Sequence, residues 1–134
     1  AQAERRRKEY NIKLANVDMR AELLSGGNLQ RVILARELNR NPKVMVCVQP
    51  TRGLDVGAIE HVHSCILATR SYGTGVLLIS TEMEEIRMLS DRIAVIFRGK
   101  IMDIVKNDDT LDLDRIGLLM AGVQPEEGTC HAEN

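Results

Sequence analysis

The sequence predicts an α/β fold with parallel strands, flanking helices and a β-hairpin near the carboxyl end. Short aliphatic runs at residues 44–48, 76–79 and 93–97 alternate with longer segments whose apolar residues recur at helical spacing. That order of strand and helix favours right-handed crossovers and a parallel sheet. With 134 residues, of which 44% are hydrophobic, the chain suits one soluble globular domain with a single core.

The first forty residues are predicted to hold two helices. Residues 3–10 are charged and helix-prone, and residues 11–20 show no sustained period and are expected to form a loop. A second helix follows Ser25, a natural N-cap residue, and ends before Asn41-Pro42. Its apolar positions are Leu29, Val32, Ile33 and Leu38.

The middle of the chain is predicted to build the sheet. Residues 44–48 are continuously aliphatic, which is typical of a strand buried on both faces, and Pro50 ends that strand. A helix is expected over residues 56–72, because apolar residues share one of its faces. A strand over residues 76–79 and a short acidic helix over residues 83–89 follow.

The last third is predicted to form a hairpin and a helix. Arg98-Gly99 separates a strand over residues 93–97 from a return strand over residues 100–105, as a two-residue hairpin turn does. Residues 110–121 are expected to form an amphipathic helix capped by Gly122. The tail over residues 124–134 is expected to be disordered.

Composition excludes several classes of function. Lys and Arg number 18 against 19 Asp and Glu, so the near-neutral charge gives no electrostatic reason to expect nucleic acid as the partner. Aromatic residues make up 2%, which argues against base-stacking platforms and aromatic sugar clefts. An odd number of cysteines, three, favours a reducing compartment, and no apolar run is long enough for a signal peptide or membrane span.

Ser25-Gly26-Gly27 is the segment most typical of a binding site. A serine N-cap followed by two glycines at a helix start leaves free N–H groups at the positive end of the helix dipole, with no Cβ atoms in the way. This pattern predicts an anion site. The alternative is an ordinary helix start after a glycine-rich turn.

Other polar side chains are interpreted as structural. His61, His63 and Cys65 do not form a metal site, because residues two apart on a helix point away from one another. We expect His63 to be half-buried by packing and His61 to be solvated. Cys47 and Cys65 are expected to be reduced core thiols.

Three acidic residues near the expected helix at 83–89 could be a paired-carboxylate site. They are Glu82, Glu84 and Glu85. Acidic residues at a helix start already complement its dipole, so we expect no further role for them.

The order of these motifs resembles the second half of an ABC-type ATPase domain, over residues 10–122. The matching residues are Leu24-Ser25-Gly26-Gly27-Asn28, Arg31, 44–48, Pro50-Thr51, Gly53-Leu54-Asp55 and Ser80-Thr81-Glu82. Asn28 and residues 51–53 and 117–122 resemble the carboxyl-terminal cassette of double-cassette ATPases that energise nucleoside and sugar importers, and the nucleoside branch is favoured. The resemblance implies a partial P-loop NTPase fold: residues 1–40 as part of a helical subdomain, residues 41–122 as a partial α/β ATPase core, and residues 123–134 as a tail.

The resemblance also implies a composite site. In this family two cassettes close head to tail around two ATP molecules, and each site joins the Walker A loop of one cassette to the signature of the other. The implied signature residues are Leu24, Ser25, Gly26, Gly27, Asn28 and Gln30, and the implied D-loop is Gly53, Leu54 and Asp55. Ser25 and Gly27 would reach the γ-phosphate of ATP held, with Mg, by the partner cassette.

Departures from the family pattern imply that this cassette's own site is degenerate. The sequence contains no Gly-x-x-x-x-Gly-Lys-Ser/Thr string, so we expect it to bind no nucleotide by itself. The family's Mg-associated Asp falls on Val48, its catalytic Glu on Gln49 and its switch His on Thr81. The parent protein is expected to be an ATPase and this chain alone to be inactive.

The expected partners follow from the same resemblance. They are the N-terminal cassette of the same polypeptide, membrane permease subunits and, indirectly, a substrate-binding protein, at the cytoplasmic face of the membrane. The chain starts with Ala and is expected to be a piece of a longer polypeptide. Two alternatives stay open: a non-transport ABC protein that clamps nucleic acid or a ribosome, and a regulatory module without turnover.

The missing Walker A strand has a structural consequence. In the family it lies between the strands equivalent to residues 76–80 and 93–97, so its absence leaves two unpaired apolar edges. Such edges pair with another chain or close on each other. We therefore expect a homodimer or a rearranged sheet.

Overall fold

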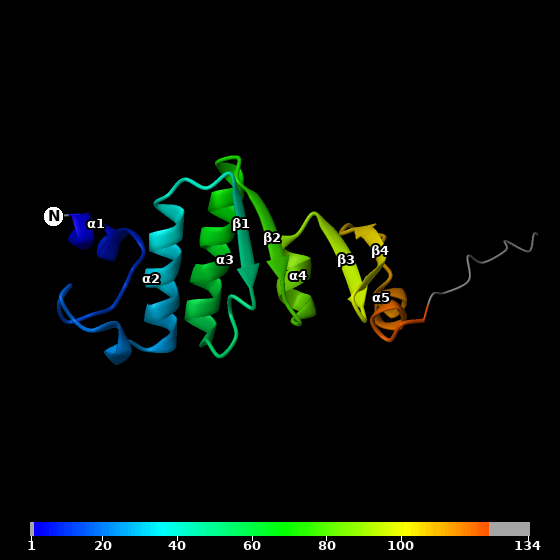
Figure 1. Cartoon of the computed structure of the whole chain (residues 1–134), viewed down its shortest axis with the longest axis horizontal. Helices are drawn as coiled ribbons and strands as arrows, with labels where there is room; N and C mark the ends of the chain where they lie inside the picture. Colours follow the sequence, from blue (N-terminus) through cyan, green and yellow to red (C-terminus); the bar gives the residue numbers. More distant parts are fainter. Residues whose placement is uncertain (1, 124–134) are drawn as a thin grey trace, which may run out of the picture. The chain divides into compact units, whose positions relative to one another are not determined.

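A computed structural model of the chain describes residues 2–123 (Figure 1). The chain separates into two compact units, one up to Glu85 and one from Ile86 on. The expected tail at residues 124–134, with Cys130, lies outside the described residues.

Two helices open the first unit. They are α1 (Gln2–Glu9) and α2 (Gly26–Leu38), joined by a loop that holds one 3-10 turn, η1 (Ala21–Leu23). The predicted helices over residues 3–10 and after Ser25 are confirmed, and Ser25 is the N-cap of α2. Leu34 and Ala35 are the buried residues of α2.

The parallel sheet of the first unit has two strands. β1 (Val44–Val48) and β2 (Gly75–Ile79) pair in parallel from Val44 opposite Gly75 to Val48 opposite Ile79. They are joined through α3 (Val56–Ser71), which packs between α2 and the sheet (Figure 1). The core side chains of α3 are almost fully enclosed, with Val62 at 0% and Ile66 at 2% exposure.

The expectation that residues 44–48 are buried on both faces is wrong. Met45 and Cys47 are buried, whereas Val44, Val46 and Val48 are 66%, 58% and 61% exposed. Successive side chains of a strand point to opposite faces, so Met45 and Cys47 lie on one face of this sheet and the exposed valines on the other. The second face therefore presents its aliphatic side chains outward.

The third aliphatic run does not join the parallel sheet. β3 (Arg92–Phe97) pairs antiparallel with β4 (Lys100–Lys106), so the described strands form two separate two-stranded sheets. Of the two expected consequences of unpaired strand edges, direct closure of the gap does not occur among the described strands.

The predicted two-residue hairpin turn is confirmed. Arg98 and Gly99 both have positive φ, 46° and 77°, as a type I′ turn requires. The register shifts between Val95 and Ile96, because β4 contains one extra residue there. Ile93 and Val95 supply the buried face of the hairpin.

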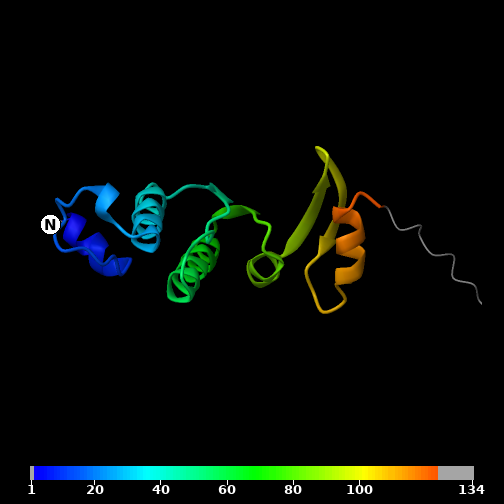
Figure 2. The ribbon, with the colours of Figure 1, turned by 90° about the horizontal axis from the view of Figure 1, so that it is seen from below.

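A short helix, α5 (Leu113–Met120), packs on the hairpin through Ile116 and Leu119 (Figure 2). It starts three residues later than predicted, because Asp112 caps it: its Oδ1 accepts hydrogen bonds from the N–H groups of Asp114 and Arg115, both 3.0 Å. The acidic helix α4 (Met83–Leu89) matches its prediction. No described helix is long and apolar enough to span a bilayer.

Candidate functional site

The start of α2 is open to solvent. The Ser25 Oγ accepts hydrogen bonds from the backbone N–H of Asn28 at 3.4 Å and from the Asn28 side-chain amide at 3.0 Å. Ser25 and Gly26 are exposed and Gly27 is partly exposed. The first-turn N–H groups of Gly26 and Gly27 have no acceptor among the described residues. The helix start can therefore bind an anion that approaches from outside.

Two polar side chains of α2 hold the preceding loop in place. The Asn28 Oδ1 accepts a hydrogen bond from the Lys13 N–H at 2.8 Å, and the Arg31 Nη1 donates to the Asn11 carbonyl at 2.8 Å. Asn28 thus joins the N-cap serine to the loop. Leu24 and Gln30, the remaining residues of the expected signature, lie partly buried on either side of this helix start.

The two glycines have different surroundings. A Cβ on Gly27 would lie 3.0 Å from the Ala58 Cβ and 3.8 Å from the Asp55 Oδ2, whereas a Cβ on Gly26 would have only the Leu54 Cδ2 near it, at 3.8 Å. Gly27 therefore faces the start of α3, and the absence of a side chain there allows the two helices to approach. Gly26 is the glycine that leaves room on the solvent side.

The residues expected to form the D-loop lie beside the expected signature residues. Gly53 has φ +74°, and Asp55 is the N-cap of α3, where its Oδ1 accepts a hydrogen bond from the Ala58 N–H at 3.0 Å. Two turn hydrogen bonds, from Arg52 to Gln49 and from Leu54 to Thr51, shape the segment between β1 and α3. The structure thus brings together two groups that lie more than twenty residues apart in sequence.

The positions expected to be degenerate lie at the carboxyl ends of β1 and β2. The Gln49 side-chain amide donates to the Thr81 Oγ1 at 3.3 Å, and the Gln49 N–H donates to the Ile79 carbonyl at 2.8 Å. Val48, at the last position of β1, is 61% exposed. An amide and a hydroxyl bonded to each other offer no carboxylate that could accept a proton from water.

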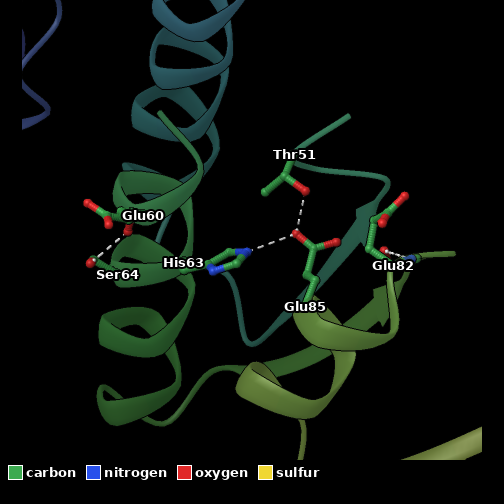
Figure 3. Close-up of polar contacts among 7 residues, drawn as sticks. Thr51, Glu60, His63, Ser64, Glu82 and Glu85 are labelled. Carbon is green, nitrogen blue, oxygen red and sulfur yellow. Dashed lines mark hydrogen bonds and ion pairs between the residues drawn. The ribbon is translucent and has the colours of Figure 1, made fainter. Parts of the chain in front are cut away.

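A buried polar cluster lies behind this edge of the sheet. Glu85 is 4% exposed, and its Oε1 accepts hydrogen bonds from the Thr51 Oγ1 at 2.8 Å and from the His63 Nε2 at 3.1 Å (Figure 3). The interpretation that Glu85 only complements a helix dipole is wrong. Glu82 and Glu84 are exposed, as solvated acidic residues are.

Sequence reasoning missed this cluster. His63 is 8% exposed and hydrogen-bonded, not half-buried by apolar packing alone. One local signal was available: Glu85 is four residues from the apolar Leu89, a spacing that places both on the same face of a helix. The distant partners Thr51 and His63 gave no signal in the sequence.

A second polar contact on α3 joins His61 and Cys65. The Cys65 Sγ is 3.6 Å from the His61 Nε2, one helical turn apart. Burial and the Arg31 charge lower the pKa of His61, which is partly buried and not freely solvated. Burial raises the pKa of the Cys65 and Cys47 thiols, and the Glu85 charge adds to the rise at Cys47.

The described residues contain no group of three or more His, Cys, Asp or Glu side chains placed to hold a metal ion. The side chains of His61 and His63 go to different partners, His61 to Cys65 and His63 to Glu85.

Several ATP-binding proteins are similar to the chain in sequence, although no family model matches it. It is 50% identical over 119 residues to the guanosine import ATP-binding protein NupO of Bacillus subtilis, which covers 89% of this chain and 23% of that protein. It is 47% identical over 114 residues to the nucleoside import ATP-binding protein NupA of Lactococcus lactis, with 85% and 22% covered. It is 48% identical over 116 residues to the glucose import ATP-binding protein TsgD13 of Haloferax volcanii, with 87% and 21% covered.

The chain thus spans about a fifth of the length of the curated relatives that it matches.

Solved structures share its fold. The ATP-binding subunit of an ABC transporter matches with a TM-score of 0.74 at 17% identity, over 89% of this chain and 52% of that chain. A dimeric bacterial ABC transporter cassette matches with a TM-score of 0.68 at 25% identity, over 80% and 46%. The chain therefore belongs to the ABC-type ATPases, as part of a cassette whose curated relatives are ATP-binding proteins of nucleoside and sugar import.

Proposed function

We propose that the chain is the signature-bearing part of the second cassette in the ATP-binding subunit of a nucleoside or simple-sugar importer. Its role is to present Ser25, Gly26 and Gly27 to the γ-phosphate of an ATP molecule held by the other cassette. The exposed start of α2, with two open N–H groups, is the observation that carries the proposal.

The chemistry at this helix start is electrostatic. Open N–H groups and the positive end of the helix dipole stabilise a phosphate by about 0.3–2 kcal/mol. The contact exists only when the two cassettes are closed, so ATP stabilises the closed state through it. That change of state is what the permease subunits would use to move a solute.

The chain's own half of the second site is proposed to be inactive. Val48, Gln49 and Thr81 occupy the edge of the sheet, where Gln49 and Thr81 bond to each other. Loss of a general base typically lowers turnover by about 10²- to 10⁴-fold. ATP and Mg held by the partner cassette would supply the triphosphate and its counter-ion to the start of α2.

The proposed partners are the N-terminal cassette of the same polypeptide, the permease subunits and, indirectly, a substrate-binding protein, at the cytoplasmic face of the membrane. The relatives support an import role for nucleosides or sugars in nearly equal measure, at 50% identity to the guanosine protein and 48% to the glucose protein. Solute choice is assigned to the permease and the binding protein, whose residues this chain does not contain.

The test is ATP turnover by the complete ATP-binding subunit carrying Ser25→Asp. Aspartate is as good an N-cap as serine, so α2 remains intact, but its charge repels phosphate. We expect turnover to fall at least about tenfold, with no change in thermal stability. Gln49→Glu in the same protein tests whether this chain's own half of the second ATP site is inactive, and we expect it to raise turnover. Unchanged turnover in both variants would refute the proposal and favour a regulatory module.

A further inference from the structure

The buried carboxylate of Glu85 connects three elements of the first unit (Figure 3). Thr51 follows β1, His63 lies on α3, and Glu85 lies in the first turn of α4. The Glu85 and His63 side chains are only 3% and 10% exposed. A buried carboxylate is tolerated only where hydrogen bonds compensate its lost hydration, so these two bonds determine where Glu85 can lie.

Both bonds fall on one carboxylate oxygen. Oε1 accepts from the Thr51 hydroxyl and from the His63 ring, while Oε2 is buried and has no partner among the described residues. The Thr51 hydroxyl cannot turn to a second acceptor without leaving Oε1 with only one bond. Hydrogen bonds to charged groups are the stronger kind, so Thr51 is held firmly.

Thr51 begins the segment that carries the D-loop. Its carbonyl accepts a hydrogen bond from the Leu54 N–H at 3.1 Å, and Leu54 precedes Asp55, the N-cap of α3. A Cβ on Gly26 would in turn lie 3.8 Å from the Leu54 Cδ2, and a Cβ on Gly27 would lie 3.8 Å from the Asp55 Oδ2 and 3.0 Å from the Ala58 Cβ. A continuous set of contacts therefore runs from Glu85 through Thr51 and the D-loop to the start of α2.

We propose that Glu85 is a positioning residue: through Thr51 it fixes residues 51–55, and with them the D-loop, against the start of α2. His63 orients the carboxylate so that Oε1 faces Thr51. Glu85 does not touch nucleotide and acts only through Thr51. The effect on ATP turnover rests on the proposed function, whereas the effect on the structure of residues 51–55 does not.

The structural test is amide hydrogen exchange, followed by NMR on the 134-residue chain. Thr51→Val removes the hydroxyl and keeps the side-chain shape, while Thr51→Ser keeps the hydroxyl and is the matched control. We expect Thr51→Val to speed exchange of the Leu54 amide by about tenfold or more, and Thr51→Ser to restore slow exchange. The Gln49 amide, bonded to the Ile79 carbonyl, should keep its rate in both variants.

A purely structural role for Glu85 makes a different prediction. In that case Thr51→Val would speed exchange at Gln49 and Leu54 alike, or at neither amide, and Thr51→Ser would bring no specific rescue. Either result would overturn the proposal. Glu85→Gln offers a second variant, because its side-chain oxygen can still accept the Thr51 hydroxyl, and the Leu54 amide should remain better protected than in Thr51→Val.

A kinetic measurement on the complete ATP-binding subunit separates this inference from the proposed function. Thr51→Val is expected to lower kcat several-fold and to leave KM for ATP unchanged, because nucleotide is held elsewhere. Faster Leu54 exchange with unchanged kcat would refute the proposed function and leave the positioning role intact. Unchanged Leu54 exchange would refute the positioning role whatever the kinetics.

Discussion

Gly27 shows how one residue can meet a packing requirement inside a segment that looks like a binding motif. Its missing Cβ lets α2 approach Ala58 of α3, while a Cβ on Gly26, one residue earlier, would meet only the Leu54 Cδ2, at an ordinary contact distance of 3.8 Å. Two adjacent glycines therefore have separate reasons for being glycine. The proposed approach of a phosphate involves Gly26 and Ser25, and the close approach of α2 to the start of α3 involves Gly27.

Alanine at each glycine tests this division. Alanine gains up to about 1 kcal/mol in a helix over glycine, but overpacking costs about 1–3 kcal/mol. We expect Gly27→Ala to be less stable than Gly26→Ala by about 1–2 kcal/mol, measured by urea unfolding. Equal stability of the two variants would contradict the close approach at Ala58.

His61 predicts a pH dependence. Burial and Arg31 lower its pKa, so the unfolded chain binds a proton at this site that the folded chain rejects. Stability should therefore rise with pH across the interval from the lowered pKa up to the ordinary value of 6.5, and be fully present above it. The free energy of unfolding measured across this interval should vary less in His61→Gln. A His61 resonance that titrates at or above 6.5 would contradict burial as the dominant influence on this ring.

Among the helices and strands, α5 shows how a single glycine ends an element. Gly122 has φ +83°, and the N–H groups of Gly122 and Val123 bond to the carbonyls of Leu119 and Leu118 at 3.0 and 2.9 Å. This is a Schellman end, as the predicted glycine cap implies. A Cβ on Gly122 would also overlap the Phe97 ring of β3, so the same residue ends α5 and seats it on the hairpin.

Gly99 provides a matched control for Gly122. It too has positive φ, +77°, but nothing lies within 4 Å of its absent Cβ. Gly99→Ala should cost about 1 kcal/mol, from backbone conformation alone, whereas Gly122→Ala should cost about 2–4 kcal/mol. Thermal unfolding of both variants measures the difference. Similar losses would mean that Phe97 moves aside without penalty.

Local signals explain which elements could be predicted. Ser25 before a periodic segment, Arg98-Gly99 between aliphatic runs and Gly122 after α5 each act within a few residues, and the structure has them where the sequence predicts. The prediction that Val46 is buried was wrong for a different reason: the exposure of a strand residue depends on what covers that face of the sheet. The Glu85 cluster joins residues 22 and 34 positions apart, a pairing that no short pattern contains.

For the molecule as a whole, the most unusual surface is the uncovered face of the first sheet. It is formed by Val44, Val46, Val48, Leu77 and Ile79, which are 48–66% exposed. Adjacent aliphatic side chains on one sheet face favour association with another surface. A homodimer therefore remains the expected outcome for the chain alone.

Val46→Lys tests the dimer, because it places a charge at the centre of this face. Sedimentation equilibrium should show a concentration-dependent dimer for the unchanged chain and a monomer for Val46→Lys. Tyr72→Lys, at an 89% exposed position outside the sheet, is the control and should still dimerise. A monomer at all concentrations in the unchanged chain, with protected amides in β1 and β2, would rule the dimer out.

The start of α2 is proposed to meet a triphosphate held by another cassette, and everything else in the proposed function depends on that contact. Its most direct test is a calorimetric titration with MgATP, run on this chain and on the complete ATP-binding subunit. We predict no saturable heat from the chain at roughly tens of micromolar nucleotide, and saturable binding by the complete subunit. Saturable micromolar binding by the chain alone would contradict the proposed contact.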